Sequence, residues 1–353
     1  MRTPRPFTAV TIAVALAVGL AGCGDTTSNS TDRRTVRLLT HDSFAVSDDV
    51  LAAFTADTGI EVELVQGGDA GSVVNQAILA AGNPQADVLF GIDSTFLTRA
   101  LEADLFEPYE AADLDRVDPA LLLDDEHRVT PIDYGDVCLN YDQAWFGEHD
   151  LAVPTSLDDL VDPAYADLLV VQNPATSSPG LAFLLATIEE LGDGWEAWWT
   201  ALRANGVEVT DGWESAYYGS FSGGGGSEGT RPLVVSYASS PPAEVVFADP
   251  PVDDPPTGVI EAGCFRQVEG AGILAGTDHR DEAEALVDFL LSEPFQADVP
   301  LSMFVFPVRS GVDLPEVFVQ HAARPSEVLT MTAADIGAGR DEWIDRWTDL
   351  VLR

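Results

Sequence analysis

The chain has 353 residues, and its 59 acidic side chains outnumber its 17 basic ones, so that the formal net charge is −42. A surface of that sign cannot neutralise phosphates, which argues against a DNA or RNA partner. All of the basic residues are arginines, and the lack of lysine excludes a phosphate-loop lysine and a Schiff-base lysine. The length predicts two lobes of ordinary domain size. We interpret the acidity as a feature of solubility, of adaptation to salt or of a lysine-poor composition, and not as a single acidic ligand site.

The first residues of the chain have the pattern of a secretion signal. Two arginines precede an uncharged apolar run from 7 to 20, which is too short for a stable membrane span. The run ends in Leu20-Ala21-Gly22-Cys23, which resembles the lipobox of bacterial lipoproteins. That resemblance implies a signal peptide over 1–22 and a lipid-modified Cys23 at the mature N-terminus; an ordinary signal peptide is the alternative. Residues 23–35 are rich in Ser, Thr and Asp and predict a flexible tether.

Two further cysteines remain, Cys138 and Cys264. In an oxidising compartment such a pair predicts a disulfide, with two buried free thiols as the alternative. Neither cysteine has another Cys or a His at metal-ligand spacing, which argues against zinc. We expect no bound metal.

After the tether, short apolar strands alternate with helices. Strands are predicted at 36–40, 60–65 and 86–91, with helices starting near Ser47 and Ser72 between them. Such a series implies parallel strands joined by right-handed crossovers, which bind ligands at the carboxyl ends of the strands. There the chain carries three polar segments, namely Asp42-Ser43-Phe44, Asp69-Ala70-Gly71-Ser72 and Asp93-Ser94-Thr95. Backbone N–H groups at helix starts can bind an anion or a polar ligand, although any one of these residues could simply cap its helix.

The middle of the chain, from about 131 to 255, repeats the alternation and predicts a second lobe. Strands are expected at 168–172 and 233–237, and the polar turn Thr176-Ser177-Ser178 leads into an apolar helix at 181–191. The run Gly223–Gly226 follows no strand and precedes no lysine, so we expect a turn without a phosphate role. Helices are also predicted near 280–291 and 333–352.

No catalytic motif is found in the sequence. The five histidines are scattered, and neither a G-x-S-x-G elbow nor an HExxH motif is present. What recurs is an aromatic residue beside Gly, Ser or Asp near a predicted strand end, at Phe44, Tyr134, Trp213, Tyr237 and Phe304. Aromatic faces and carboxylates together suit an organic cation. For each aromatic taken alone, a half-buried core position is the alternative.

Several segments follow one another in a characteristic order: Thr40-His41-Asp42-Ser43-Phe44, Ala86-Asp87-Val88-Leu89-Phe90-Gly91-Ile92-Asp93, Asp133-Tyr134-Gly135, Thr176-Ser177-Ser178-Pro179-Gly180-Leu181, Gly212-Trp213-Glu214-Ser215-Ala216-Tyr217, Ser236-Tyr237-Ala238-Ser239-Ser240-Pro241 and Phe306-Pro307-Val308. Together they resemble the thiamine-binding proteins of bacterial ABC importers. The resemblance covers nearly all of the chain from Val36 onward. It implies an α/β, two-lobed periplasmic-binding-protein fold of type II, related to ferric-iron binding proteins. Such a protein closes on thiamine or its phosphates in a cleft between lobes joined by crossover strands.

The resemblance also implies ligand contacts on both lobes. Contacts to the phosphate or hydroxyethyl end fall on Asp69, Ala70, Gly71 and Ser72 from the first lobe and on Thr176, Ser177 and Ser178 from the second. Trp213 and Tyr237 match aromatic contact positions, and Phe304 lies where the family has a tryptophan. The family's aromatics near Asp48 and Ala243 are absent here. The remaining residues of the expected site are Asp42, Ser43, Asp93, Asp133, Tyr134 and Tyr217.

We therefore expect a lipid-anchored, extracytoplasmic solute-binding protein that acts as a monomer without cofactor or turnover. Its partners are thiamine or a thiamine phosphate and the permease of an ABC importer. The first lobe is expected over 36–131 and about 256–310, the second over 132–255, and a helical segment over 311–353 packs on both. Asp42, Asp93, Asp133 or Glu214 complements the cation. One alternative is a solute-binding protein for ferric iron or another small cation, and the isolated Tyr237 argues against iron. A secreted hydrolase is the alternative of another class.

Overall fold

One mixed sheet organises residues Arg34–Arg353, which the computed structural model describes. Eight strands follow the order β2-β1-β3-β9-β5-β8-β6-β7, with β10 (Phe306–Pro307) paired to β5 and β4 (Phe106–Glu107) paired to β9. The expected signal peptide, Cys23 and the tether up to residue 33 lie outside the described residues. The last two residues assigned to the tether belong to β1 instead, because they pair with Ile60 and Glu61 of the neighbouring strand.

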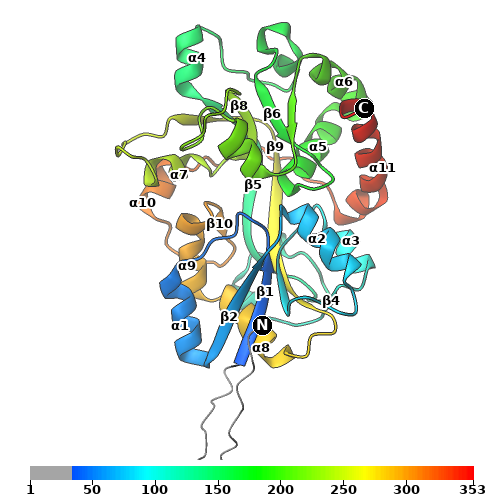
Figure 1. Ribbon diagram of the computed structural model, residues 1–353, viewed down its shortest axis with the longest axis vertical. Helices are drawn as coiled ribbons and strands as arrows, with labels where there is room; N and C mark the ends of the chain where they lie inside the picture. Colours follow the sequence, from blue (N-terminus) through cyan, green and yellow to red (C-terminus); the bar gives the residue numbers. More distant parts are fainter. Residues whose placement is uncertain (1–33) are drawn as a thin grey trace, which may run out of the picture. The chain divides into compact units, whose positions relative to one another are not determined.

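The first lobe is built on three parallel strands, as the alternating pattern predicted. They are β1 (Arg34–Thr40), β2 (Ile60–Gln66) and β3 (Val88–Asp93), joined by α1 (Asp48–Thr58) and α2 (Ala70–Leu79). The short α3 (Leu97–Glu102) follows β3, and α8 (Arg280–Leu290) and α9 (Glu293–Ser302) return to this lobe from later in the chain (Figure 1). A cluster that includes the fully buried Phe54 and Phe90 forms its core.

The second lobe repeats this architecture. Its strands are β6 (Leu169–Gln172), β7 (Glu208–Thr210) and β8 (Leu233–Tyr237), and β6 runs parallel to both of the others. Its helices are α4 (Gln143–His149), α5 (Ser178–Leu191), α6 (Trp195–Ala204), α7 (Pro241–Val246) and a π-helical turn at Ser215–Ser220. The helix α5 starts three residues before the predicted position, because the side chain of Ser177 caps it by accepting from the N–H of Gly180.

Short 3₁₀ turns occur in both lobes. They lie at Leu114–Arg116, Pro119–Leu121, Asp158–Val161, Pro163–Tyr165 and Gly192–Gly194.

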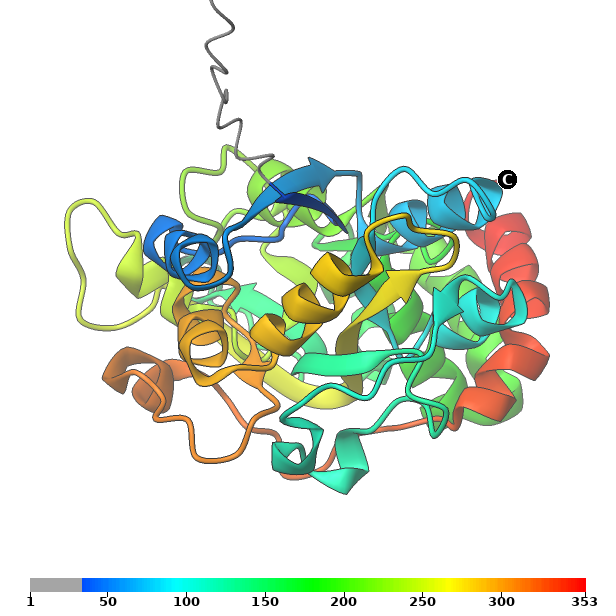
Figure 2. The same ribbon diagram turned by 90° about the horizontal axis from the view of Figure 1, so that it is seen from below.

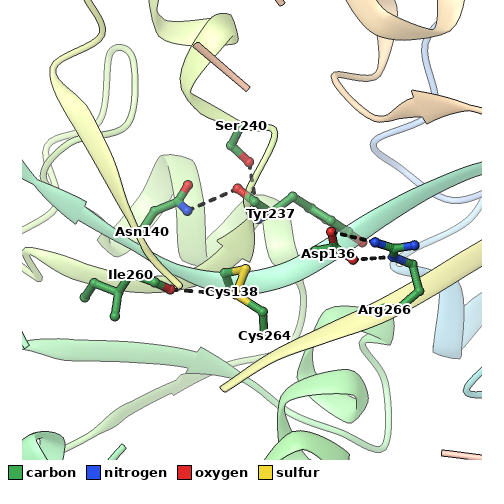
Figure 3. Close-up of a disulfide and its surroundings, with 8 residues drawn as sticks. All are labelled: Asp136, Cys138, Asn140, Tyr237, Ser240, Ile260, Cys264 and Arg266. Carbon is green, nitrogen blue, oxygen red and sulfur yellow. Dashed lines mark hydrogen bonds and ion pairs between the residues drawn. A yellow bond between two sulfur atoms is a disulfide. The ribbon is translucent and has the colours of Figure 1, made fainter. Parts of the chain in front are cut away.

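Two long antiparallel strands, β5 (Thr130–Asp142) and β9 (Thr257–Leu274), run through both lobes and connect them. The register between them shifts at Val137/Leu139. At that shift Cys138 and Cys264 are joined by a disulfide, with Cα atoms 4.4 Å apart (Figure 3). The expected lobe boundary at 131–132 falls inside β5, so the strand itself is the crossover.

The C-terminal helix α11 (Ala333–Val351) packs against α3 of the first lobe and α6 of the second, on the outside of the molecule (Figures 1 and 2). Its fully buried Trp347 meets Trp199 with ring centroids 5.4 Å apart, and Arg340 lies over the ring of Phe96. Both tryptophans therefore serve packing. The short helix α10 (Glu316–His321) packs against α7. Within Arg34–Arg353, no helix combines the length and apolar character needed to span a membrane.

Candidate ligand cleft

A cavity of about 290 Å³ lies between the lobes, where the carboxyl ends of their parallel strands meet. Both lobes contribute side chains to it, as a binding cleft requires. Of the residues that the sequence analysis placed in the site, those that line this cavity are Asp42, Ser43, Asp69, Ala70, Ser178, Trp213, Tyr217, Tyr237 and Phe304. Glu214, which was considered as a partner for a cation, lines it too.

Two aromatic residues of the cavity wall are held in place by hydrogen bonds. The indole N–H of Trp213 donates to Oγ of Ser236 at 2.9 Å, and the ring stacks on Tyr217 with centroids 4.9 Å apart. The hydroxyl of Tyr237 donates to Oε1 of Gln267 at 2.7 Å. The backbone carbonyl of Tyr237 accepts from the side chain of Asn140, as Figure 3 shows. These contacts therefore fix the orientation of both rings in the cavity wall.

Tyr134 does not line the cavity, although the sequence analysis placed it there. Its strand β5 pairs with β10, and the Tyr134 ring stacks on Phe306 with centroids 5.4 Å apart. The guanidinium of Arg266 lies 5.0 Å from the centre of the same ring. The ring of Tyr134 thus packs on Phe306 and makes a cation–π contact with Arg266.

The two helix-start segments that were expected to bind a phosphate meet each other instead. The carboxylate of Asp69 accepts from Oγ of Ser177 at 2.8 Å and from the N–H of Ser178 at 3.0 Å. The N–H of Ser72 donates to the carbonyl of Thr176, also at 3.0 Å. Gly71 is tightly enclosed, since an added Cβ would lie 2.7 Å from that carbonyl oxygen. Gly71, Ser72, Thr176 and Ser177 therefore form a contact between the lobes and do not line the cavity.

Asp69 is thereby a buried carboxylate that bridges the lobes. Its third partner is the backbone N–H of Trp213, at 2.9 Å. Burial raises the pKa of Asp69, and the hydrogen bonds from Ser178, Trp213 and Ser177 offset only part of that shift.

Asp93 and Asp133 also lie outside the cavity wall, in a buried acidic cluster behind it. They flank Glu269 on neighbouring strands, because Asp93 of β3 and Asp133 of β5 are both register partners of this β9 residue. Burial raises the pKa of Asp93 to about 7. It raises the pKa of Asp133 well above its usual range, with further contributions from Glu269 and Asp93. The Oδ2 atom of Asp133 has no hydrogen-bond partner in the described part of the chain.

His41 and Glu269 are cavity residues that sequence reasoning missed. Nε2 of His41 lies 3.2 Å from Oε1 of Glu269. Burial alone would lower the pKa of His41, but Glu269, with smaller contributions from Asp69 and Asp42, reverses the shift and raises it. Gly91 makes room for this pair, since a Cβ there would lie 2.6 Å from the imidazole and the residue has φ +103. The only sequence signal for Glu269 was a charged residue within an apolar stretch.

Nine further cavity residues were also absent from the predicted site, namely Ala45, Pro179, Tyr218, Ser240, Ala243, Phe247, Ser302, Met303 and Val305. Within Arg34–Arg353, no group of three or more His, Cys, Asp or Glu side chains is arranged to hold a metal ion.

Comparison with known proteins agrees with this architecture. Residues 83–330 match the family model of the bacterial extracellular solute-binding proteins. A thiamine-binding periplasmic protein of Salmonella typhimurium is 31% identical over 318 residues, which cover 89% of this chain and 92% of the relative. The solved structure of a periplasmic thiamin binding protein superposes with a TM-score of 0.80 at 29% identity, covering 95% of this chain and 100% of that one.

A more distant structure, the iron-bound HitA from Pseudomonas aeruginosa, shares the fold with a TM-score of 0.69 at 22% identity, covering 90% of this chain and 99% of that one. The family model spans well over half of the present chain, and its members are extracytoplasmic by description. The chain therefore belongs to the family of bacterial extracellular solute-binding proteins.

Proposed function

We propose that this protein captures thiamine outside the cytoplasm and delivers it to the permease of an ABC importer. The observation that carries the proposal is the lining of the cleft, in which Trp213, Tyr217 and Tyr237 stand beside carboxylates from both lobes. Thiamine consists of two linked aromatic rings, one of which carries a permanent positive charge. Aromatic faces attract such a cation, and carboxylates balance it. The names of the curated relatives support the same ligand.

Four carboxylates line the cavity. Three of them, Asp42, Glu214 and Glu269, are proposed to complement the cation, whereas Asp69 accepts the hydrogen bonds that join the lobes. Burial raises the pKa of Glu214, and the neighbouring Asp42 adds to the shift. A cationic ligand would relieve this repulsion between like charges. Among the described residues that line the cavity, none is an arginine, and the one basic side chain is His41, which faces Glu269 at 3.2 Å.

We further propose that unphosphorylated thiamine is the preferred ligand. The amide and hydroxyl at the start of α5, which would suit a phosphate, already donate to Asp69. A phosphate at this position would have to displace that carboxylate or lie close to it, and two anions repel each other.

The ferric-iron alternative is less well supported by the chemistry of the cleft. Iron(III) binds tyrosine as the phenolate, so a raised phenol pKa opposes its binding. Burial raises the pKa of Tyr237 well above its usual range, and Glu269 adds to the shift. The pKa of Tyr217 is raised in the same way by burial and by Glu244.

Calorimetry tests these proposals with the chain purified by unfolding and refolding, which removes any bound ligand. Thiamine, thiamine monophosphate and ferric citrate are titrated in separate experiments. We expect saturable binding with thiamine, weaker binding with the monophosphate and none with iron. Chromatography should recover thiamine chemically unchanged, because binding without turnover is proposed. Binding of iron but not of thiamine would replace this function by the iron alternative.

We also propose that a lipid on Cys23 anchors the protein to the outer face of the cytoplasmic membrane, which leaves the cleft free to close and dock on the permease. In membrane fractions of cells that process the signal peptide, Cys23→Ser should appear as soluble protein or as an unprocessed precursor. Unchanged membrane retention of a processed Cys23→Ser form would contradict the anchor.

A further inference from the structure

A large apolar side chain is exposed at the edge of the cleft. Phe247 follows the last residue of α7 and lines the cavity, yet it is 68% exposed. Exposed hydrophobic residues that are scattered singly over a surface need no explanation. Phe247 differs from these because it borders the ligand cavity, where its exposed apolar area is available to a bound molecule.

The partner of Phe247 comes from the opposite lobe. Its ring centroid lies 5.5 Å from that of Phe304, with the ring planes inclined at 71°. Phe304 follows α9 of the first lobe, whereas α7 belongs to the second, so the pair spans the cleft. In this edge-to-face arrangement one of the two rings keeps a free face that can stack on a ligand.

The backbone of Phe304 is held in an unusual conformation. Its φ of +56 lies in the left-handed region, which bulky side chains rarely adopt. Such conformations cost free energy and concentrate at sites that clamp a ligand. The conformation directs the Phe304 side chain toward the cavity that it lines.

The helix α7 explains why Phe247 can cover the cavity. The N–H of Phe247 donates to the carbonyl of Ala243 at 3.0 Å, so the two residues lie one turn apart on the same side of the helix. Ala243 lines the cavity with a single methyl group. Ala243 therefore contributes little apolar surface to the cavity wall, and the ring of Phe247, one turn later, contributes more.

We propose that Phe247 is a specificity-determining residue, which closes over the bound ligand together with Phe304 and selects an aromatic cation. This inference rests on the proposed function, because it takes thiamine as the ligand. The cation is attracted to the face of the ring, and covering the ring by the ligand removes apolar surface from water. Phe247 therefore slows the escape of the ligand from the closed cleft.

The test compares Phe247→Ala and Phe247→Leu with the wild type by calorimetry and stopped-flow kinetics. The ligands are thiamine and a neutral isostere in which a thiophene replaces the thiazolium ring. We expect Phe247→Ala to bind thiamine about tenfold more weakly, which corresponds to about 1.4 kcal/mol. The loss should lie mainly in faster dissociation. Phe247→Leu should lose less, and the neutral isostere should lose less than thiamine does.

Leu79→Ala is the matched control, because Leu79 is 89% exposed on α2 and does not line the cavity. It should bind thiamine as the wild type does. Thermal unfolding without ligand verifies that each variant is folded, and Phe247→Leu keeps the test valid if the alanine variant is unstable. If both Phe247 variants match a wild type that binds thiamine, this inference is wrong and the proposed function stands. If the wild type does not bind thiamine, both fall. Equal losses for thiamine and the isostere would refute the selection of the cation.

Discussion

Asp69→Ala should open the cleft, because it removes the carboxylate that ties the lobes together. Asp69 belongs to the first lobe, and its three hydrogen-bond donors, Ser177, Ser178 and Trp213, belong to the second. The bonds can therefore form only when the lobes are closed. Loss of the carboxylate should shift the equilibrium toward an open form and weaken the binding of thiamine.

The size of the effect follows from the burial of this carboxylate. A hydrogen bond to a charged group contributes roughly 1.5–3 kcal/mol, and one between neutral groups roughly 0.5–1.5 kcal/mol. The pKa of Asp69 is raised because desolvation opposes its charge more than these hydrogen bonds favour it. We therefore use the range for bonds between neutral groups. At about 1 kcal/mol for each bond, the closed form loses about 3 kcal/mol, or a factor of about 100 in its ratio to the open form.

The apparent dissociation constant rises as the closed fraction falls. We therefore expect Asp69→Ala to bind thiamine up to about 100-fold more weakly, with Asp69→Asn in between because it keeps one acceptor oxygen. Calorimetry measures the affinity, and small-angle scattering of the ligand-free protein measures the opening. Asp57→Ala, which removes an exposed carboxylate from α1, is the control. The reasoning fails if Asp69→Ala retains both the affinity and the scattering profile of the wild type.

Three further predictions follow from the buried acidic cluster, the disulfide and the aromatic wall. Asp133→Asn should stabilise the fold at pH 8 by roughly 1–3 kcal/mol but not near pH 3. The pKa of Asp133 is raised in the folded protein, so its carboxyl group contributes full stability below the pKa that it has in the unfolded chain. That stability is lost as the pH rises through the folded pKa. Urea titrations of the wild type and the variant at several pH values would measure the difference. Replacing Cys138 and Cys264 together by Ser should cost about 2–5 kcal/mol, because the bridge spans a sequence separation of 126; in denaturant titrations, the reduced wild type should match this variant. A cation on an aromatic face gains about 0.5–2 kcal/mol, so Trp213→Ala should weaken thiamine binding in calorimetry by about two- to thirtyfold. An unchanged affinity would count against the aromatic wall.

The sequence by itself determined the elements whose signals are local. The first three strands and the helices between them follow from apolar periodicity, and parallel pairing follows from their alternation. The sequence also predicted the helices α2 and α5, although α2 begins two residues before the expected start near Ser72 and α5 three residues before 181. Because the carboxyl ends of such strands meet at one edge, the sequence also placed Asp42, Trp213 and Tyr237 at the cleft.

Only the tertiary structure decided which side chains meet across the lobes. Glu269 joins Asp93 and Asp133 because β9 pairs antiparallel with β3 and β5, and pairing between segments so far apart in the chain leaves no local pattern. The sequence placed Asp69 and Ser178 in two separate polar segments near helix starts. It could not show that the carboxylate of Asp69 would accept a hydrogen bond from the N–H of Ser178. The exposure of Phe247 likewise depends on how α7 and α9 approach each other. These contacts depend on distances through space, which single-residue propensities do not encode.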